Sequence, residues 1–553
     1  MTAAKATPDA SGSQPRRDPG HLDWLSFDNR FTRLLPDDPI RAPGSRQVPG
    51  AAFSRVEPAK AVRPRIVAWS TEVAAELGLG TDVMASAQGA DVFTGNELLV
   101  GSDPHAMNYG GHQFGSWAGQ LGDGRAIALG EVVDGGGGHY TLQLKGAGPT
   151  PYSRRADGLA VLRSSIREFL CSEAMHHLGV PTTRALSLAV TGSEVTRDIL
   201  YDGHPRPEPG AIVCRVAPSF LRFGTYQLPA SRGDIDLLRQ LADFTIVNHF
   251  GHLGDPSPEV YVAWFDEVCR TSCTLVVEWM RVGFVHGVVN TDNMSIHGLT
   301  IDYGPYGWLD DFDLDWTPNT TDAGTRRYRY GYQPQVVQWN LLQLANAIYP
   351  LVGDADGFEA ALNGFVDRYH RQYREMMLAK MGLVPSEEVR DDQLIEELVG
   401  VLGLTEIDMT IFFRRLADSA SGQEHPLGDE LGLIGPRGPL ADAFYDRSAL
   451  SGADEDRLVA WLRRYRDRVR NDTRAPGERI AAMNRINPVY VLRNYLAQEA
   501  IEAGEQGSFA MVNELLEIVR NPYDEQPGQE RFSRKRPDWA RDRPGCSTLS
   551  CSS

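Results

Sequence analysis

A short segment in which polar residues bracket two apolar runs constrains the fold most. Residues 286–304 read HGVVNTDNMSIHGLTIDYG, and apolar side chains alternate on both sides of a His-Gly dipeptide. Alternation interrupted by a glycine predicts a tight β-hairpin. Counting back from the turn pairs Met294 with Ile301. One step further, Asn293 lies opposite Asp302, and directly opposed residues have Cβ atoms only about 4.5–5.5 Å apart.

An amide and a carboxylate that converge in this way predict a site for a divalent cation. Oxygen ligands suit Mg²⁺, which takes one or two protein ligands and completes its shell with phosphate and water. Asp292 precedes the amide, so we expect it beside the metal, where a general base can act. His286, at the start of the segment, is expected to hold the loop by a hydrogen bond.

Three strands and a helix are predicted upstream of this segment. The alternating stretches HQFGSWAGQ, RAIALGEVV and HYTLQLK are typical of strands and are joined by the turns LGDG and DGGGG. The third strand ends at Lys145. Apolar residues at helical spacing between 159 and 178 then predict a helix that carries Glu168.

The order of these parts is typical of protein-kinase-like enzymes. There, a glycine turn covers phosphates, a strand lysine paired with a helix glutamate holds them, and later acid and amide groups bind metal. Other nucleotide folds are disfavoured, because Ile127 occupies the third position of the dinucleotide glycine fingerprint and no G-x-x-x-x-G-K-[ST] motif occurs. The glycines at 135–138 fall at the strand ends away from Lys145, so we interpret them as a hairpin loop, not a phosphate loop.

Each candidate residue also has a purely structural interpretation. Lys145 alone fits a solvated strand end, and Glu168 alone fits a surface carboxylate. Arg215 and Arg222, in CRVAPSFLRFG, fit structural salt bridges as well as phosphate contacts. We interpret the four aspartates between 310 and 315 as solvated or capping groups and not as metal ligands.

Composition limits the partners and the compartment. The 553 residues carry a formal charge of −18 and a pI near 5.2, which disfavours binding to nucleic acid or to an anionic membrane. No run approaches the roughly 18 apolar residues of a membrane-spanning helix, and the first residues lack the apolar core of a secretory signal. We therefore expect a cytoplasmic protein without nucleic-acid or membrane partners.

The six cysteines fall into two groups. Four stand in apolar surroundings and are expected to be buried thiols: Cys171, Cys214, Cys269 and Cys273. The last two of these have no second pair with which to form a zinc site. Cys546 and Cys551 stand in the polar stretch PGCSTLSCSS, which offers no core. Exposed thiols are predicted there, as candidates for redox chemistry.

These patterns predict an α+β, protein-kinase-like fold of two lobes with extensions at both ends. Its regions are a disordered tail (1–22), an N-terminal extension (23–100), an N-lobe of β-sheet plus the Glu168 helix (101–230), a C-lobe with the catalytic hairpin (231–350), a helical C-terminal region (351–520) and a flexible tail with the last two cysteines (521–553).

Long motifs in the sequence resemble those of the selenoprotein O family. They are YGGHQFGSWAGQLGDGRAIALGE, LQLKGAGPTPYSRRADGLAVLRSSIREFL, RVAPSFLRFGT, GFVHGVVNTDNMSIHGLTIDYGPYGWLDDFD and the terminal CSS. Similarity is strongest from Tyr109 to Asp313 and continues more weakly through RINPVYVLRNYLAQEAI. The resemblance implies a protein-kinase-like fold that binds ATP in a flipped orientation. It also implies transfer of AMP, and not of phosphate, to Ser, Thr or Tyr hydroxyls of other proteins.

The resemblance further implies roles for individual residues. Asp292 is implied as the proton acceptor, Asn293 and Asp302 as ligands of Mg²⁺ or Mn²⁺, and Glu168 as the group that orients Lys145. The implied nucleotide contacts are Gly122, Gly124, Arg125, Lys145, Asp157, Gly158, Arg215, Arg222 and Asp302. Pyrophosphate is the implied leaving group.

Two features depart from the family pattern. Cys551 stands at the family's selenocysteine position, and a thiol is a poorer nucleophile than selenium. In some relatives, a cysteine in the loop after the Asp-Tyr-Gly motif can pair with this C-terminal position. The corresponding loop here, WTPNTTDAG, has no cysteine, so Cys546 is the partner that remains for Cys551. Spacing alone leaves open a conventional ATP phosphotransferase and an inactive nucleotide-binding scaffold with a redox tail. The choice between ATP and UTP is open as well.

Overall fold

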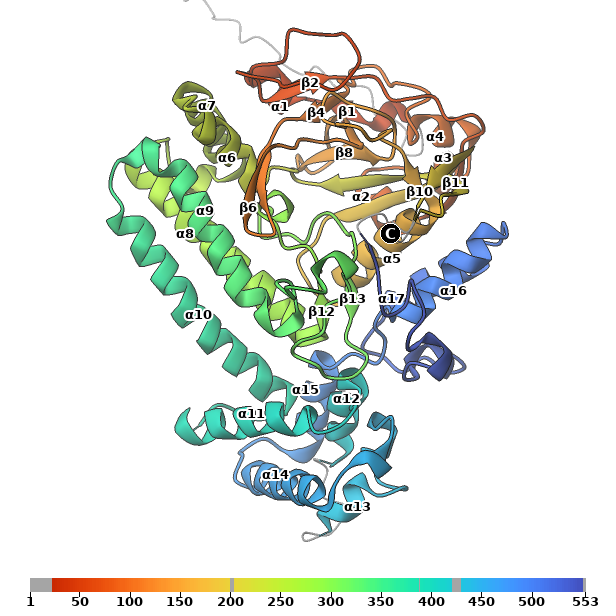
Figure 1. Cartoon of the computed structure of the whole chain (residues 1–553), viewed down its shortest axis with the longest axis vertical. Coiled ribbons are helices and arrows are strands. Elements are labelled where there is room, and N and C mark those ends of the chain that lie inside the picture. The colour runs from red at the N-terminus through yellow and green to blue at the C-terminus, as the bar shows by residue number, and fades with distance from the viewer. Residues whose placement is uncertain (1–21, 199–202, 387, 420–428, 551–553) are drawn as a thin grey trace, which may run out of the picture.

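An antiparallel sheet of nine strands forms the upper lobe of the molecule (Figure 1). The computed structural model describes residues 22–198, 203–386, 388–419 and 429–550. Along the main path of the sheet the strands are β2 (Phe53–Arg55), β4 (His105–Met107), β7 (Ala126–Val133), β8 (His139–Lys145), β11 (Arg206–Ala217), β10 (Arg184–Arg197) and β3 (Arg65–Trp69). In addition, β1 (Ser26–Phe27) pairs with β7, and β9 (Ala160–Val161) pairs with β11.

Two sets of helices cover the two faces of this sheet. Alternate residues of β11 enter different apolar clusters, as the period of two along a strand requires. Ile212 and Cys214 pack with the short helices α2 (Thr71–Glu76), α3 (Thr81–Met84) and α4 (Ala87–Val92). Ala211 and Val213 pack on the opposite face with α5 (Leu162–His177), the predicted helix that carries Glu168. The segment 23–100 thus contributes strands and a covering layer to the sheet lobe.

The strand predictions are confirmed for β7 and β8 and are wrong for residues 112–120. That stretch is part of a separate two-stranded hairpin of β5 (Gly110–Gln113) and β6 (Ser116–Gln120). Phe114 and Gly115 both have positive φ, at 52° and 84°. Two such residues form the tight turn that matches the twist of a hairpin, so the chain reverses where continuous alternation predicted one strand.

The second lobe is built from helices. It contains α6 (Phe223–Arg232), α7 (Ile235–His249), α8 (Pro258–Val282), α9 (Gln333–Val352) and α10 (Asp356–Lys380). The long helix α8 shows why the sequence forms a helix here: Ser257 caps its N-terminus by accepting a hydrogen bond from the Val260 N–H, and Pro258 occupies the first turn. It ends at Gly283, whose φ of 73° suits a glycine.

The predicted hairpin at residues 294–301 does not form a ladder, and its register is wrong. Thr291–Asn293 form a 3₁₀ turn, and a single antiparallel bridge joins Met294 to Thr300 and not to Ile301. Partners from elsewhere occupy both sides, because Arg222 bridges to Ser295 and Thr182 bridges to Thr300. The expected structural role of His286 is confirmed, since its Nε2 lies 2.9 Å from the carbonyl oxygen of Ile301.

Further helices extend the second lobe downward and then return to the sheet. They are α11 (Glu388–Leu402), α12 (Met409–Ser419), α13 (Glu430–Ile434), α14 (Gly452–Arg470), α15 (Pro476–Ile486), α16 (Asn494–Glu505) and α17 (Ala510–Val519). α16 and α17 lie beside α5 (Figure 1). Among the described residues, no helix is both long enough and apolar enough to cross a membrane.

The expectation of a tail without a core is wrong for residues 521–550. Phe532, Ala540, Cys546 and Leu549 are all buried, and the N–H of Leu549 donates to the carbonyl oxygen of Pro318 at 2.8 Å. Cys546 is therefore not the exposed thiol that was predicted, and burial raises its pKa to about 11. Cys551 and the predicted disordered tail up to residue 21 lie outside the described residues. The other four cysteines are buried, as predicted.

Candidate active site

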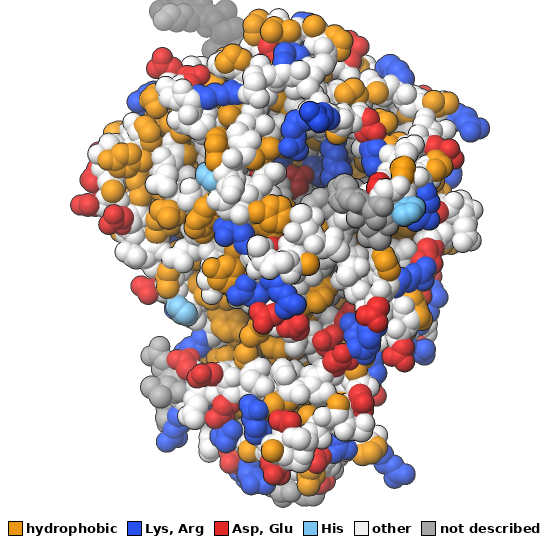
Figure 2. Space-filling model, viewed as in Figure 1, with side chains coloured by type: hydrophobic (Ala, Val, Ile, Leu, Met, Phe, Trp, Pro, Cys, Tyr) orange, Lys and Arg blue, Asp and Glu red, His pale blue; other side chains and the backbone are white. Residues whose placement is uncertain are grey.

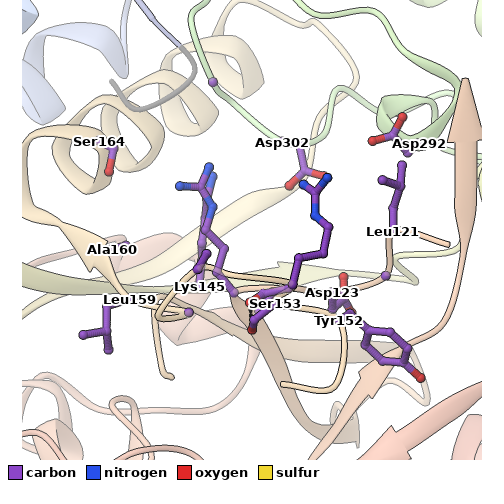
Figure 3. Close-up of a pocket in the computed structure, with 18 of the residues that line it drawn as sticks. Leu121, Asp123, Lys145, Tyr152, Ser153, Leu159, Ala160, Ser164, Asp292 and Asp302 are labelled. Atoms are coloured by element: carbon purple, nitrogen blue, oxygen red, sulfur yellow. Dashed lines mark hydrogen bonds between the residues drawn. The ribbon is translucent and has the colours of Figure 1, made fainter. Parts of the chain in front are cut away.

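A cavity of about 770 Å³ opens between the sheet lobe and the helical lobe. On the surface, Lys and Arg side chains gather around a hollow in the upper half of the face in Figure 2. The predicted residues that line the cavity are Gly122, Gly124, Arg125, Lys145, Asp157, Gly158, Arg215, Asp292, Asn293 and Asp302. Glu168 and Arg222 do not line it, but both contact residues that do. In Figure 3, Asp292 and Asp302 lie across the cavity from Lys145 and Asp123.

The predicted ion pair of Lys145 and Glu168 is present on the sheet side of the cavity. Lys145 is the last residue of β8, held between Ala126 of β7 and Val213 of β11, and Glu168 points to it from α5. Burial lowers the pKa of Lys145 to about 8, although the nearby Glu168 carboxylate opposes that shift. Burial on its own would raise the pKa of Glu168, but Arg215 and Lys145 hold it below its ordinary value. Both groups are therefore charged at neutral pH.

Two arginines hold the carboxylate of Asp302. Arg215 donates to Asp302 Oδ1 at 2.7 Å, and Arg222 donates to Oδ2. Both guanidinium groups are buried, and Arg215 also donates to Glu168. Burial would raise the pKa of Asp302, yet Arg222, Arg215 and Lys145 together hold it well below its ordinary value. The structural interpretation of the two arginines as salt-bridge partners is confirmed, and their contact with phosphate stays a prediction.

Asp292 has the opposite electrostatic setting. It lies in the 3₁₀ turn of residues 291–293 and is only 7% exposed. Gln113 donates to its Oδ2 at 3.1 Å, and among the described residues its Oδ1 has no hydrogen-bond partner. Burial raises the pKa of this carboxyl from 3.8 to about 6, against the lowering effect of the Gln113 hydrogen bond. A carboxylate of this kind is ionised at neutral pH and is basic enough to take a proton.

Asn293 and Asp302 offer the types of oxygen ligand that suit Mg²⁺, although the hairpin from which we predicted their pairing does not form. Asn293 Nδ2 donates to the carbonyl oxygen of Val288 at 2.9 Å, which leaves the side-chain oxygen as the atom available to a cation. Asp302 is ionised and lines the same cavity. An amide oxygen and a carboxylate are ligands of the type that Mg²⁺ accepts, so the residues present fit the ion.

The glycine turn between β6 and β7 packs against the loop of residues 150–158. Gly122 has a φ of 72°, and a Cβ there would lie 2.3 Å from the ring of Tyr152, so only glycine fits. In the facing loop, both carboxylate oxygens of Asp157 accept hydrogen bonds from Arg197, at 2.7 and 2.8 Å. The four glycines at 135–138 do not line the cavity, in agreement with their interpretation as a hairpin loop.

Several charged residues that line the cavity were not predicted from the sequence. Asp123, inside the glycine turn, is 3% exposed and accepts hydrogen bonds from the Met107 N–H and the Gln143 amide. Its position between two glycines and before an apolar strand is the sequence feature that could have indicated a role in the site. Arg154 and Arg155 add positive charge to the wall of the cavity, and the motif PYSRRADG gave no reason to place them there.

In the acidic loop after the Asp-Tyr-Gly motif, the prediction of solvated or capping aspartates is wrong for Asp310. Asp310 is neither solvated nor a cap, because it is 8% exposed and lies 3.5 Å from Arg493 and 3.7 Å from Arg536. Asp313 does act as a cap, since it accepts a hydrogen bond from the Asp315 N–H at 2.8 Å. The partners of Asp310 come from far along the chain, so local composition did not reveal its burial.

The fold and the cavity define a class of protein. A strand lysine paired with a helix glutamate on one lobe faces an acid-amide pair and a second carboxylate on the other, and this is the arrangement of protein-kinase-like enzymes that act on nucleotides.

Comparison with known proteins gives the family. Residues 44–520 match the family described as protein adenylyltransferase SelO, and the chain belongs to this family. It is 57% identical over 531 residues to the protein nucleotidyltransferase YdiU of Azoarcus sp. strain BH72, covering 96% of this chain and 99% of that protein. The proteins of the same name from Rhodopirellula baltica and Xanthomonas campestris pv. campestris strain B100 are 57% and 56% identical, and each match also covers 96% of this chain and 99% of the relative.

A solved structure of ROP2 from Toxoplasma gondii, titled as a virulence factor with a protein-kinase fold and no enzymatic activity, matches with 11% identity and a TM-score of 0.23. The match covers 54% of this chain and 87% of that one. Membership of this family, together with 57% sequence identity to a protein nucleotidyltransferase, shows that this chain is a nucleotidyltransferase, as the sequence motifs predicted.

Proposed function

We propose that this enzyme transfers AMP from ATP to Ser, Thr or Tyr hydroxyls of other proteins and releases pyrophosphate. The observation that carries the proposal is a pair of carboxylates in one cavity. Asp302 is held ionised by two arginines, whereas Asp292 is buried, has a raised pKa, and has one oxygen without a hydrogen-bond partner among the described residues. Two carboxylates whose environments separate their pKa values are suited to different roles in one reaction. Membership of an adenylyltransferase family supports AMP as the transferred group.

Asp292 acts as the general base in this reaction. Its carboxylate takes the proton of the acceptor hydroxyl, and the resulting oxygen attacks the α-phosphorus of ATP. A new phosphorus–oxygen bond forms to the acceptor while the bond between the α-phosphorus and its bridge to the β-phosphate breaks. The electron pair leaves with pyrophosphate. A base in this role contributes about 10²–10⁴-fold to the rate.

Asn293 and Asp302 would hold Mg²⁺ or Mn²⁺ by their side-chain oxygens, and the bound ion would supply positive charge beside the phosphate oxygens. Arg215 and Arg222 keep Asp302 ionised, and an ionised carboxylate is the form that a cation binds.

Lys145 and the glycine turn bind the nucleotide phosphates. Lys145 is positioned by Glu168, and Gly122, Gly124 and Arg125 line the same wall of the cavity. Asp157 and Gly158 line the cavity on the facing loop, where we place a further contact with the nucleotide. The protein therefore contributes mainly placement and electrostatic stabilisation, as is general for phosphoryl chemistry.

Labelled ATP tests the reaction directly. The enzyme is incubated with an acceptor protein mixture and Mg²⁺, with ATP labelled at either the α- or the γ-phosphorus. We expect protein-bound label from the α position only. Label from the γ position only would show a conventional phosphotransferase instead, and no label in either arm would favour an inactive scaffold. The same assay with α-labelled UTP tests the preferred nucleotide.

A further inference from the structure

The β5–β6 hairpin reaches from the sheet lobe onto the loop that carries Asp292. Three successive residues of the hairpin bond to three successive residues of the loop. The His112 N–H donates to Thr291 Oγ1 at 2.7 Å, Gln113 Nε2 donates to Asp292 Oδ2 at 3.1 Å, and the Phe114 N–H donates to Asn290 Oδ1 at 3.2 Å. In Figure 1, β6 reaches from the sheet lobe down toward the helices of the second lobe.

Gly111 provides the space into which the Asp292 carboxylate fits. A Cβ at this position would lie 2.6 Å from Asp292 Oδ1 and 2.8 Å from Asp292 Cβ. The backbone of Gly111 is not in the left-handed region, so its conformation alone would accept alanine. The glycine is thus required by the position of the carboxylate and not by the turn.

The same hairpin is continuous with the glycine turn of the nucleotide site. The N–H groups of Leu121 and Gly122 both donate to the carbonyl oxygen of Tyr109, at 2.9 and 3.0 Å, which closes the base of the hairpin. One stretch of chain, residues 109–124, therefore bonds to the Asp292 loop at its tip and lines the phosphate wall at its base.

We propose that the β5–β6 hairpin positions the Asp292 carboxylate relative to the nucleotide, with Gln113 as the positioning residue. This inference rests on the proposed role of Asp292 as the base. Gln113 occupies Oδ2 and Gly111 lies against the carboxylate, so the side chain has one fixed orientation. Oδ1, buried and without a partner among the described residues, is then the oxygen that receives the proton of the acceptor.

The test compares Gln113→Met with a matched control on the same hairpin. Met has the length of Gln but donates no hydrogen bond. We expect Gln113→Met to lower kcat of AMP transfer about 10- to 100-fold, the range for a lost hydrogen bond to a charged group, while the KM for ATP stays unchanged. Gln120→Met is the control, because Gln120 donates to the carbonyl oxygen of Arg46 and not to Asp292, and its kcat is expected to match wild type.

Gly111→Ala tests the fit of the carboxylate independently. A displaced base loses about 10²-fold in rate for a shift near 1 Å, so kcat is expected to fall again at constant KM for ATP. Gly135→Ala is its control, since the nearest atom to a Cβ there lies at 3.8 Å. Thermal unfolding of all four variants verifies that they fold.

The positioning role is overturned if Gln113→Met keeps the wild-type kcat, whether or not its KM for ATP is raised. Asp292→Ala, measured in parallel, separates this failure from failure of the proposed base. If Asp292→Ala is inactive and Gln113→Met is fully active, only the positioning inference is wrong. If Asp292→Ala keeps its activity, the role of Asp292 is wrong and the inference falls with it. When Gln113→Met is combined with Asp292→Ala, we expect no loss of kcat beyond that of Asp292→Ala alone, because the two residues act as one unit.

Discussion

The loop of Asp292 and the loop of Asp302 place a buried and a partly buried aspartate in one cavity under opposite electrostatic conditions. Asp302 is held by Arg215 and Arg222, whereas Asp292 accepts a single side-chain hydrogen bond from the neutral Gln113. The pKa of Asp302 lies well below its ordinary value, and that of Asp292 is raised to about 6. Burial acts on both in the same direction, so the cations decide the difference.

This difference assigns the roles. A carboxylate whose pKa lies well below its ordinary value suits a metal ion, and one whose pKa is raised toward neutrality suits proton transfer. A substitution at one aspartate changes one side of this comparison and leaves the other in place.

The largest effect is expected from Asp292→Ala. Loss of the base lowers kcat of AMP transfer by about 10²–10⁴-fold, while calorimetry detects unchanged binding of ATP with Mg²⁺, because the metal and phosphate contacts remain. Full activity in this variant would remove Asp292 from the mechanism.

Asp302→Ala is expected to reduce stability as well as activity. The substitution removes the carboxylate that Arg215 and Arg222 share. Arg215 keeps Glu168 as a partner, but the buried Arg222 loses its close carboxylate, and breaking a buried ion pair costs about 3–5 kcal/mol. Urea unfolding without metal or nucleotide measures the loss. Asp292→Ala is the control, since it removes a buried acid whose charged form folding disfavours, and it is not expected to lower the unfolding free energy near neutral pH.

The pH dependence of stability provides a third test, made on the metal-free and nucleotide-free protein. The pKa of Asp292 is about 6 in the folded state against an ordinary 3.8, so folding disfavours its charged form. Wild type therefore loses stability relative to Asp292→Asn as pH rises through this interval. The difference reaches about 3 kcal/mol near pH 7 and vanishes in acid, where both side chains are neutral. A difference independent of pH would show that Asp292 titrates normally.

The smallest effect on stability is expected from Lys145→Met. Arg222 and Arg215 contribute more than Lys145 to keeping Asp302 ionised, and Glu168 retains Arg215 as its partner. Burial lowers the pKa of Lys145 to about 8, so folding disfavours its charged form and its removal is not expected to reduce the unfolding free energy near neutral pH. The KM for ATP rises because a phosphate contact is missing. An unfolding loss as large as that of Asp302→Ala would place the stabilising charge on Lys145 instead.

Local periodicity and the order of motifs were enough to predict much of the fold. β7, β8, the helix with Glu168 and the Lys145–Glu168 pair follow from alternation, helical spacing and the position of each residue at the end of an element. These features depend on neighbours in sequence or on a common arrangement of parts, so one sequence suffices to predict them.

The features that failed depend on distant partners. The register at Met294 shifted by one residue because distant segments pair with both sides of the predicted hairpin. Arg222 bridges to Ser295, 73 residues later, and Thr182 bridges to Thr300, 118 residues later. Cys546 and Asp310 are buried by elements far along the chain. The contact of Gln113 with Asp292 spans 179 residues, and no local pattern marks it.

The mass of an acceptor protein incubated with ATP and Mg²⁺ tests the central claim most directly. Wild-type enzyme is compared with Asp292→Ala at equal concentration, with ATP binding verified for both. We expect a gain of the mass of AMP on Ser, Thr or Tyr with wild type and no gain with the variant. A gain of the mass of a single phosphate, or an equal gain of AMP with Asp292→Ala, would contradict it.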